Sequence, residues 1–212
     1  WNRWLATGGQ FISLRVDQKP FDDLRVRRAL NLAVNQQEIV DHFYGGHAEL
    51  MAYPQHPEFG EYFEPLEAMP NAVQELFTYD PEEARRLLDE AGVPEGFSFD
   101  LQVCSCSPSH MDLVPLLESY FSRVGLKTNI QTMEYASFLS AMTTKTHGPA
   151  YLLTSGHVNP MTTIRKSFVT GQTWNPSQYS DPEFDEKVRA LHETRDEQER
   201  IKILRSLTRE IL

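Results

Sequence analysis

The sequence predicts an α/β fold, a mixed sheet flanked by helices, and three observations support this prediction. Residues 97–133 have the pattern of a strand, a helix and a second strand, which is the crossover that builds α/β sheets. Two acid-proline pairs, Asp80-Pro81 and Asp181-Pro182, predict amphipathic helices before and after it. Hydrophobic residues make up 40% of the 212 residues, which is enough to bury a core.

The first predicted elements are a strand and two helices. Residues 10–16 alternate polar and apolar side chains, which is the pattern of a half-buried strand. Asp22 and Asp23 can cap the helix that follows, and residues 36–43 predict a second, short helix that Gly45-Gly46 closes. The apolar stripe of the first helix comprises Val26, Ala29, Leu30 and Ala33.

The middle of the chain joins an irregular stretch to the clearest helix start. Residues 47–78 are rich in Pro, Glu and aromatic residues without a period, which predicts a long surface excursion packed by its own rings. Asp80 then fits the N-cap, Pro81 the first helical position, and Gly92 the left-handed residue after the helix. The buried stripe of this helix comprises Ala84, Leu87, Leu88 and Ala91.

The crossover begins with a strand whose apolar residues share one face. We expect the next helix to be capped by Asp112, to tolerate Pro115 in its first turn and to run to Gly125. Residues 126–133 form the second strand. The apolar face of the first strand comprises Phe97, Phe99, Leu101 and Val103.

Short elements alternate in the last third of the chain. Residues 135–142 predict a helix, and residues 150–154 predict a strand that runs into a polar loop at 155–160. Ligands usually meet an α/β sheet at such a loop. Asp181-Pro182 starts the penultimate helix. The last two helices bury Phe184, Val188 and Leu191, and Ile201, Leu204 and Ile211, respectively.

Charge and cysteine content restrict the classes of function. A formal net charge of -10 argues against nucleic-acid binding, because phosphates require a basic surface. Cys104 and Cys106 are the two cysteines, and side chains two residues apart on an extended strand point to one face without disulfide geometry. We therefore expect free or half-buried thiols rather than a bridge or a redox pair.

Several segments, taken in order, resemble the family 5 extracellular solute-binding proteins, the peptide, nickel and opine receptors of ABC importers. Each segment alone is a capped helix or a turn that many proteins carry. The resemblance therefore rests on the order in which the segments follow one another along the chain. The similar segments are residues 21–30 (FDDLRVRRAL), 79–97 (from YDP to PEGF), 117–130 with Gly125, and 175–185 (NPSQYSDPEFD).

The resemblance implies a specific architecture and function. These segments belong to the C-terminal lobe of a two-lobed periplasmic-binding-protein-like fold of cluster C, so residues 1–212 are expected to form a single α/β lobe excised from a larger protein, with its N-terminal lobe absent. The implied partners are a small polar solute, peptide-like or opine-like, the membrane permease of an ABC importer, and the missing lobe. The implied location is periplasmic or extracellular at the cell surface, either lipid-anchored or secreted, with any export signal upstream of Trp1.

One departure from the family pattern affects the expected ligand. Peptide receptors similar to this chain carry an acid that pairs with the peptide amino terminus, and Gly156 stands at that position here. A buried ammonium needs a countercharge, so the resemblance does not carry over free-amine peptide recognition through this residue. Sugar-like, opine-like and metal-chelate ligands therefore stay open.

The candidate ligand-binding residues lie at predicted strand ends and in polar or aromatic loops. A polar solute needs convergent donors and acceptors, and an aromatic wall can stack on it. For each residue the alternative is an ordinary role as a cap, a core side chain or a solvated loop residue. The candidates are Ser107, His110, Tyr135, Thr154, Ser155, Gly156, His157, Asn159 and Trp174.

We expect no catalytic residue, no metal site and no cofactor. The seven histidines lack the short paired spacing of a zinc site, and no hydrolase elbow, P-loop or His-Glu-x-x-His motif occurs. Two alternatives to an importer receptor remain at this stage. A cytoplasmic solute sensor with the same fold would follow a DNA-binding region, and an unrelated α/β enzyme domain would hold strongly perturbed acids or histidines in a pocket.

Overall fold

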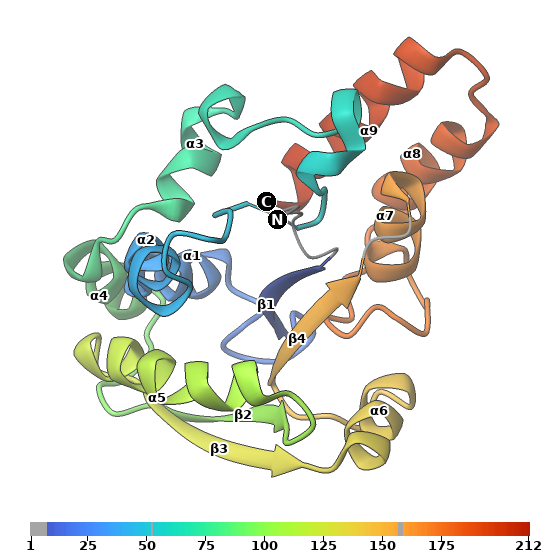
Figure 1. Ribbon diagram of the computed structural model, residues 1–212. Coiled ribbons are helices and arrows are strands. Elements are labelled where there is room, and N and C mark those ends of the chain that lie inside the picture. Colours follow the sequence, from blue (N-terminus) through green and yellow to red (C-terminus); the bar gives the residue numbers. More distant parts are fainter. Residues whose placement is uncertain (1–7, 52, 157–158) are drawn as a thin grey trace.

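A single mixed sheet organises the computed structural model, which describes residues 8–51, 53–156 and 159–212 (Figure 1). The strands are β1 (Gly8–Leu14), β2 (Ser98–Cys104), β3 (Lys127–Met133) and β4 (Ala150–Gly156). Their order across the sheet is β1-β4-β2-β3. Strand β2 runs parallel to both β3 and β4, whereas β1 is antiparallel to β4. The predicted α/β fold with a mixed sheet is confirmed.

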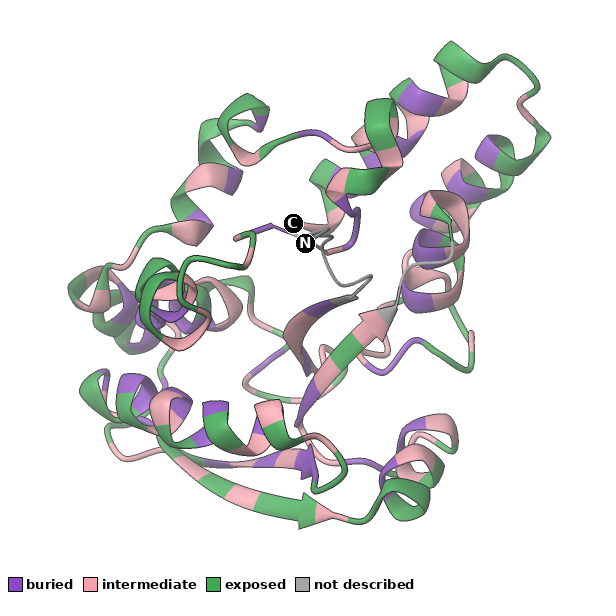
Figure 2. Cartoon of the chain, in the orientation of Figure 1, coloured by how far each residue is buried: buried purple, intermediate pink, exposed green. Residues whose placement is uncertain are grey.

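The predicted crossover is the unit β2–α5–β3. Strand β2 buries Phe99, Leu101 and Val103, because it lies between two neighbouring strands and beneath helix α5 (Pro108–Arg123). Leu101 pairs with Ile130 of β3, which sets the register. Figure 2 shows the contrast with β3, an edge strand that is largely exposed.

Helix α5 begins five residues earlier than expected. Ser107, and not Asp112, is its N-cap, because the Ser107 hydroxyl accepts a hydrogen bond from the backbone N–H of His110. Pro108 occupies the first helical position, where its missing N–H costs nothing. Pro115 therefore lies inside the helix and not in its first turn.

Helices α1 (Leu24–Ala33) and α4 (Pro81–Glu90) have the predicted caps. The Asp23 carboxylate accepts from the backbone N–H of Arg25, and the Asp80 carboxylate accepts from that of Glu83. Gly92 follows α4 with a φ of 74°, the left-handed conformation that favours glycine. The buried stripes of both helices join α5 and the sheet in the largest core, although Ala91 and Phe97 are only partly buried.

The short helix expected at 36–43 is confirmed as α2 (Gln36–Glu38), which continues directly into the π-helix η1 (Ile39–Phe43). The excursion at 47–78 contains four short helical segments among its described residues. It packs partly on its own side chains and partly against other elements, since Tyr62 donates to Glu197 of the last helix and Tyr53 stacks on Phe11. Methionines contribute to this packing together with aromatic rings, since Met51 and Met69 are buried there and Leu212 at the chain end packs against them. The four segments are η2 (Pro57–Tyr62), η3 (Leu66–Ala68), α3 (Asn71–Gln74) and η4 (Glu75–Phe77).

Helices α8 (Pro182–Glu193) and α9 (Glu197–Ile211) form a second core with α7 (Pro160–Phe168), and the three lie together in Figure 1. Helix α7 was not predicted, although Asn159-Pro160 starts it with a regular cap: the Asn159 side chain accepts from the N–H of Thr162. The predicted burial of α8 and α9 holds, except that Ile211 is only partly buried. No helix in the described part of the chain is long and apolar enough to cross a membrane.

The expectation of free thiols is wrong, because Cys104 and Cys106 form a disulfide. The chain leaves the extended conformation directly after Cys104 and turns, and the N–H of Ser105 donates to the carbonyl of Met133. The two Cα atoms consequently lie 5.1 Å apart, closer than the roughly 6.6 Å of residues two apart in a strand and within the range of disulfides.

Candidate ligand-binding site

The candidate site lies where β4 ends beside the beginning of β1 and the entry of α5. Strand β4 continues two residues further than predicted, because Gly9 and Gly8 of β1 pair with Ser155 and Gly156. In the same ladder Gln10 lies opposite Thr154. The sheet thus places polar residues from the start of the chain beside residues from its last third.

One hydrogen bond joins two of the predicted residues across elements. The Nε2 atom of His110 lies 2.7 Å from the hydroxyl of Thr154. His110 is 4% exposed, and burial lowers the pKa of its imidazole. A neutral ring therefore orients the Thr154 hydroxyl at neutral pH.

A chain of hydrogen bonds extends this polar cluster to η1. The Tyr44 hydroxyl donates to the Oε1 atom of Gln10 at 2.6 Å, and the Nε2 atom of Gln10 donates to the hydroxyl of Ser109 at 3.1 Å. Ser109 in turn lies 3.3 Å from the hydroxyl of Ser107. The polar cluster, defined as Gln10, Tyr44, Ser107, Ser109, His110 and Thr154, is therefore connected internally by hydrogen bonds.

A cavity of about 160 Å³ opens at the same end of β4, on the face that carries Phe11 and Leu153, whereas Thr154 meets His110 on the opposite face. Thr154, Ser155 and Trp174, three of the predicted residues, line it together. Trp174 is 47% exposed, so the cavity is open on at least one side. The other lining residues are Phe11, Tyr53, Met142, Leu153, Lys166, Ser167 and Pro176.

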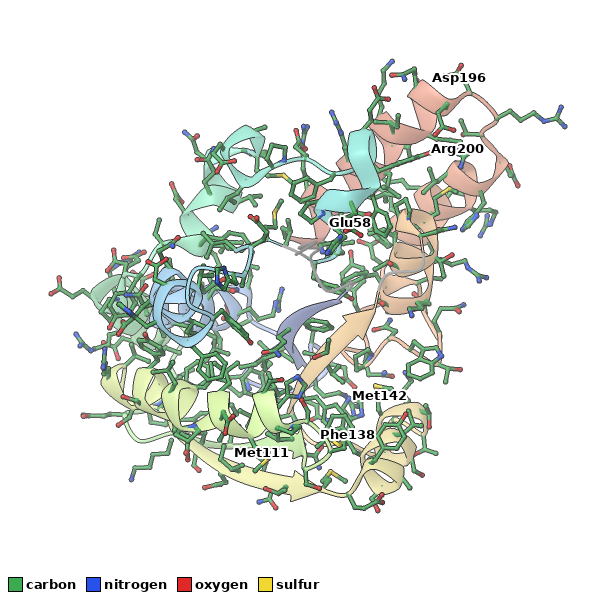
Figure 3. The ribbon with its side chains drawn as sticks, viewed as in Figure 1. Glu58, Met111, Phe138, Met142, Asp196 and Arg200 are labelled. Atoms are coloured by element: carbon green, nitrogen blue, oxygen red, sulfur yellow. A yellow bond between two sulfur atoms is a disulfide. The ribbon has the colours of Figure 1, made fainter. Side chains whose placement is uncertain are left out.

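Aromatic and thioether groups form the apolar walls of this cavity. The rings of Phe11 and Tyr53 stack at 4.1 Å between centroids, and Tyr53 also contacts the ring of Phe168. Met142 reaches the sheet from α6 (Tyr135–Thr143), beside Phe138, as Figure 3 shows. Lys166 is the single charged residue among the described residues of the lining, and its Nζ atom lies 5.8 Å from the centroid of the Trp174 ring.

The other predicted residues have different positions. Tyr135 is the first residue of α6, 56% exposed, and does not line the cavity. Asn159 caps α7, so its side-chain oxygen is already engaged. Gly156 ends β4 and belongs to the strand rather than to the predicted loop. His157 lies outside the described residues.

Sequence reasoning missed Phe11, Tyr53 and Lys166. Phe11 lies on a strand that was predicted, and its aromatic side chain could have been recognised as a candidate for the wall of a site beside β4. Tyr53 comes from the excursion, whose path has no periodic signal, and Lys166 lies on the helix that was not predicted. These two residues join the site only through tertiary packing.

A larger hollow of about 400 Å³ lies between α3, η3 and η4. None of the predicted ligand-binding residues lines it, and its walls include Glu67, Asn71 and Glu75 from the exposed excursion. No group of three or more His, Cys, Asp and Glu side chains in the described ranges is placed to hold a metal ion. The smaller cavity by β4 is therefore the stronger site candidate, because it joins predicted residues from several elements.

Comparison with known proteins places the chain among solute receptors. The family described as bacterial extracellular solute-binding proteins, family 5 Middle, matches residues 5–176. Di/tripeptide-binding protein 1 of Pseudomonas aeruginosa is 33% identical over 133 residues, which are 61% of this chain and 23% of that protein. The glutathione-binding protein GsiB of Salmonella typhimurium is 28% identical over 206 residues, which are 92% of this chain and 38% of the relative.

Solved structures share the fold. The oligopeptide-binding protein AppA of Bacillus subtilis, in complex with a nonapeptide, superposes with a TM-score of 0.84 at 19% identity. The superposition covers 98% of this chain and 43% of AppA. The chain thus spans less than half of the length of each of these three proteins.

Proposed function

We propose, from the premise that this chain belongs to the bacterial extracellular solute-binding proteins of family 5, that it is one lobe of a receptor that encloses a small polar solute for an ABC importer. The observation that carries the proposal is the open, aromatic-walled cavity at the end of β4, whose strand is held from its other face by the hydrogen bond between His110 and Thr154. Rigid side chains around a half-open cavity bind a solute without having to be ordered by it.

The size of the cavity supports a two-lobed mode of binding. Complete ligand pockets in proteins measure about 300–1,000 Å³, whereas this cavity measures about 160 Å³. It therefore holds one chemical group of a solute and leaves the remainder to be covered by another surface. A second lobe that closes over the same solute would supply that surface.

The chemical class of the solute follows from the relatives and from the donors in the site. The relatives named above bind dipeptides, tripeptides, glutathione and a nonapeptide, so a peptide-like solute is the first candidate. The hydroxyl of Ser155, at the cavity wall, suits its amide groups. The relatives are binding proteins, and in the proposal this chain likewise performs no covalent chemistry.

The proposed setting is outside the cytoplasm, in the periplasm or at the cell surface, secreted or held by a lipid anchor. The family description supports an extracellular location, and a membrane permease is the proposed partner. A DNA-binding region in the same natural chain would instead favour the cytoplasmic sensor.

Calorimetry tests the two-lobe proposal. Trialanine and glutathione are titrated separately into the 212-residue chain and into the full natural chain that carries it. We expect the full natural chain to bind at least one of them about a hundredfold more tightly, because closure adds a second set of contacts. Equal affinity in both proteins would contradict the proposal.

A further inference from the structure

The charge of the cavity is set by Lys166. No carboxylate is among the described residues that line the cavity, and in the same part of the chain no carboxylate oxygen lies within 4 Å of the Lys166 ammonium. Lys187, by contrast, pairs with Glu183 and Glu210. Lys166 thus brings a positive charge to the cavity that no described acid neutralises by direct contact.

The cavity offers this charge together with an apolar space of defined size. A cavity of about 150 Å³ accommodates one benzene ring, and this one measures about 160 Å³. Phe11, Leu153 and Met142 supply apolar contacts for such a group, and the Trp174 ring supplies an aromatic face. The Ser155 hydroxyl, on the same face of β4 as Leu153, adds a hydrogen-bonding group at this wall.

We infer that the cavity selects an organic anion, a carboxylate borne on a ring or short apolar chain, which Lys166 pairs with while the apolar part contacts Phe11 and Trp174. This inference rests on the proposed function, because it names the chemistry of the solute group that this lobe holds. It also names Lys166 as the residue that determines specificity.

A cationic group is disfavoured at the same place. The Lys166 ammonium already lies over one face of the Trp174 ring, so a second cation at this ring would meet a like charge. The net charge of -10 on the whole chain, by itself, would favour a cation over an anion. Charges more than about 8 Å away are largely screened at physiological ionic strength, so the nearby ammonium dominates.

Three probes of matched shape test the inference on the full natural chain: 3-phenylpropionate, 3-phenylpropanamide and 3-phenylpropylamine. Binding is followed by the NMR signal of the Trp174 indole N–H, which the W174F variant assigns. We expect the carboxylate to bind about tenfold more tightly than the amide, which is the gain of one hydrogen bond to a charged group. The amine should bind more weakly than the amide.

Variants separate Lys166 from general charge effects. K166Q should reduce the affinity for the carboxylate to that for the amide and leave the amide unchanged, whereas K166R should retain the preference. K202Q is the matched control, because Lys202 is an exposed lysine of α9 and its loss changes the net charge equally. The control should keep the tenfold preference.

Two results would overturn the inference. In the first, the amide or the amine binds as tightly as the carboxylate, or K166Q keeps the preference; the cavity is then a solute site of another specificity, and the proposed function stands. In the second, none of the probes moves the Trp174 signal. The inference is then wrong, and the calorimetric titration with trialanine and glutathione decides separately whether the lobe binds solute elsewhere.

Discussion

The two halves of the sheet are built from different strands and differ in how far their side chains are buried. Around β2, the side chains of Leu101 and Val103 are fully buried beneath α5. Along β4, burial is complete at Tyr151 and gives way to an exposed Thr154 three residues later. In the first region, β2 with α5, the side chains form the core. In the second, the end of β4 with β1, some side chains stay exposed and line the candidate site.

The largest expected difference comes from one substitution made in both regions. Leu101→Ala should lower the free energy of unfolding by about 2–5 kcal/mol, because it opens a cavity in a close-packed core. Leu153→Ala should cost less, because Leu153 is only half-buried and already lines an open cavity. Urea unfolding measures both, and equal losses would show that the two regions do not differ in packing.

The next effect concerns the hydrogen bond between His110 and Thr154. Thr154→Val keeps the shape of the side chain but leaves the buried Nε2 atom of His110 without a partner. We expect a loss of about 1–3 kcal/mol in the free energy of unfolding. Thr132→Val on exposed β3 is the control and should change it by less than about 0.5 kcal/mol. If Thr154→Val leaves the free energy of unfolding unchanged, the hydrogen bond between His110 and Thr154 does not stabilise the site.

Helix caps give a smaller effect, which should be the same on α4, in the core that contains β2, and on α7, which follows β4. Asp80→Ala on α4 and Asn159→Ala on α7 each remove one cap and should each cost about 1 kcal/mol, seen as a lower Tm. Asp89→Ala, near the other end of α4, removes no cap and serves as control. If Asn159→Ala weakens trialanine binding while stability falls no further than in Asp80→Ala, Asn159 contacts the solute as well as capping α7.

The smallest expected effect is a pH dependence of stability in the second region. Burial lowers the pKa values of His110 and His147 below 6.5, so the unfolded chain binds more protons than the folded chain as the pH falls through 6.5. The free energy of unfolding should therefore be lower at pH 5.5 than at pH 7.5. The double variant H110Q/H147Q should show a smaller difference, and H42Q, at an exposed site, the same difference as the parent. A parent chain equally stable at both pH values would contradict this.

Local signals account for what the sequence predicts well. Asp80, Pro81 and Gly92 act through bonds within a few residues, and the stripe on α4 needs only helical spacing, so these features follow from the sequence directly. The start of α5 was mistaken because Ser107-Pro108 and Asp112 both fit a cap, and only the contact with the His110 N–H decides between them. The disulfide was missed because it depends on a turn directly after β2.

The site itself was only half predictable. Thr154, Ser155 and Trp174 were expected as binding residues and do line one cavity, because strand ends and loop aromatics carry that signal in the sequence. Tyr53 and Lys166 complete the same walls from an aperiodic excursion and an unpredicted helix. Tertiary packing brings them to β4, and no local pattern encodes it.

The antiparallel pairing of β1 with β4 has a consequence for how the protein matures. Gln10 and Phe11 meet Thr154 and Leu153 only after the chain has closed a very long loop, which is a slow and entropically costly step. A nascent polypeptide halted before residue 150 would contain every buried side chain of β2 and α5. It would still lack β4 and therefore the proposed solute cavity. Bound solute in the proposed cavity would thus indicate that β1 and β4 have both been synthesised and have paired.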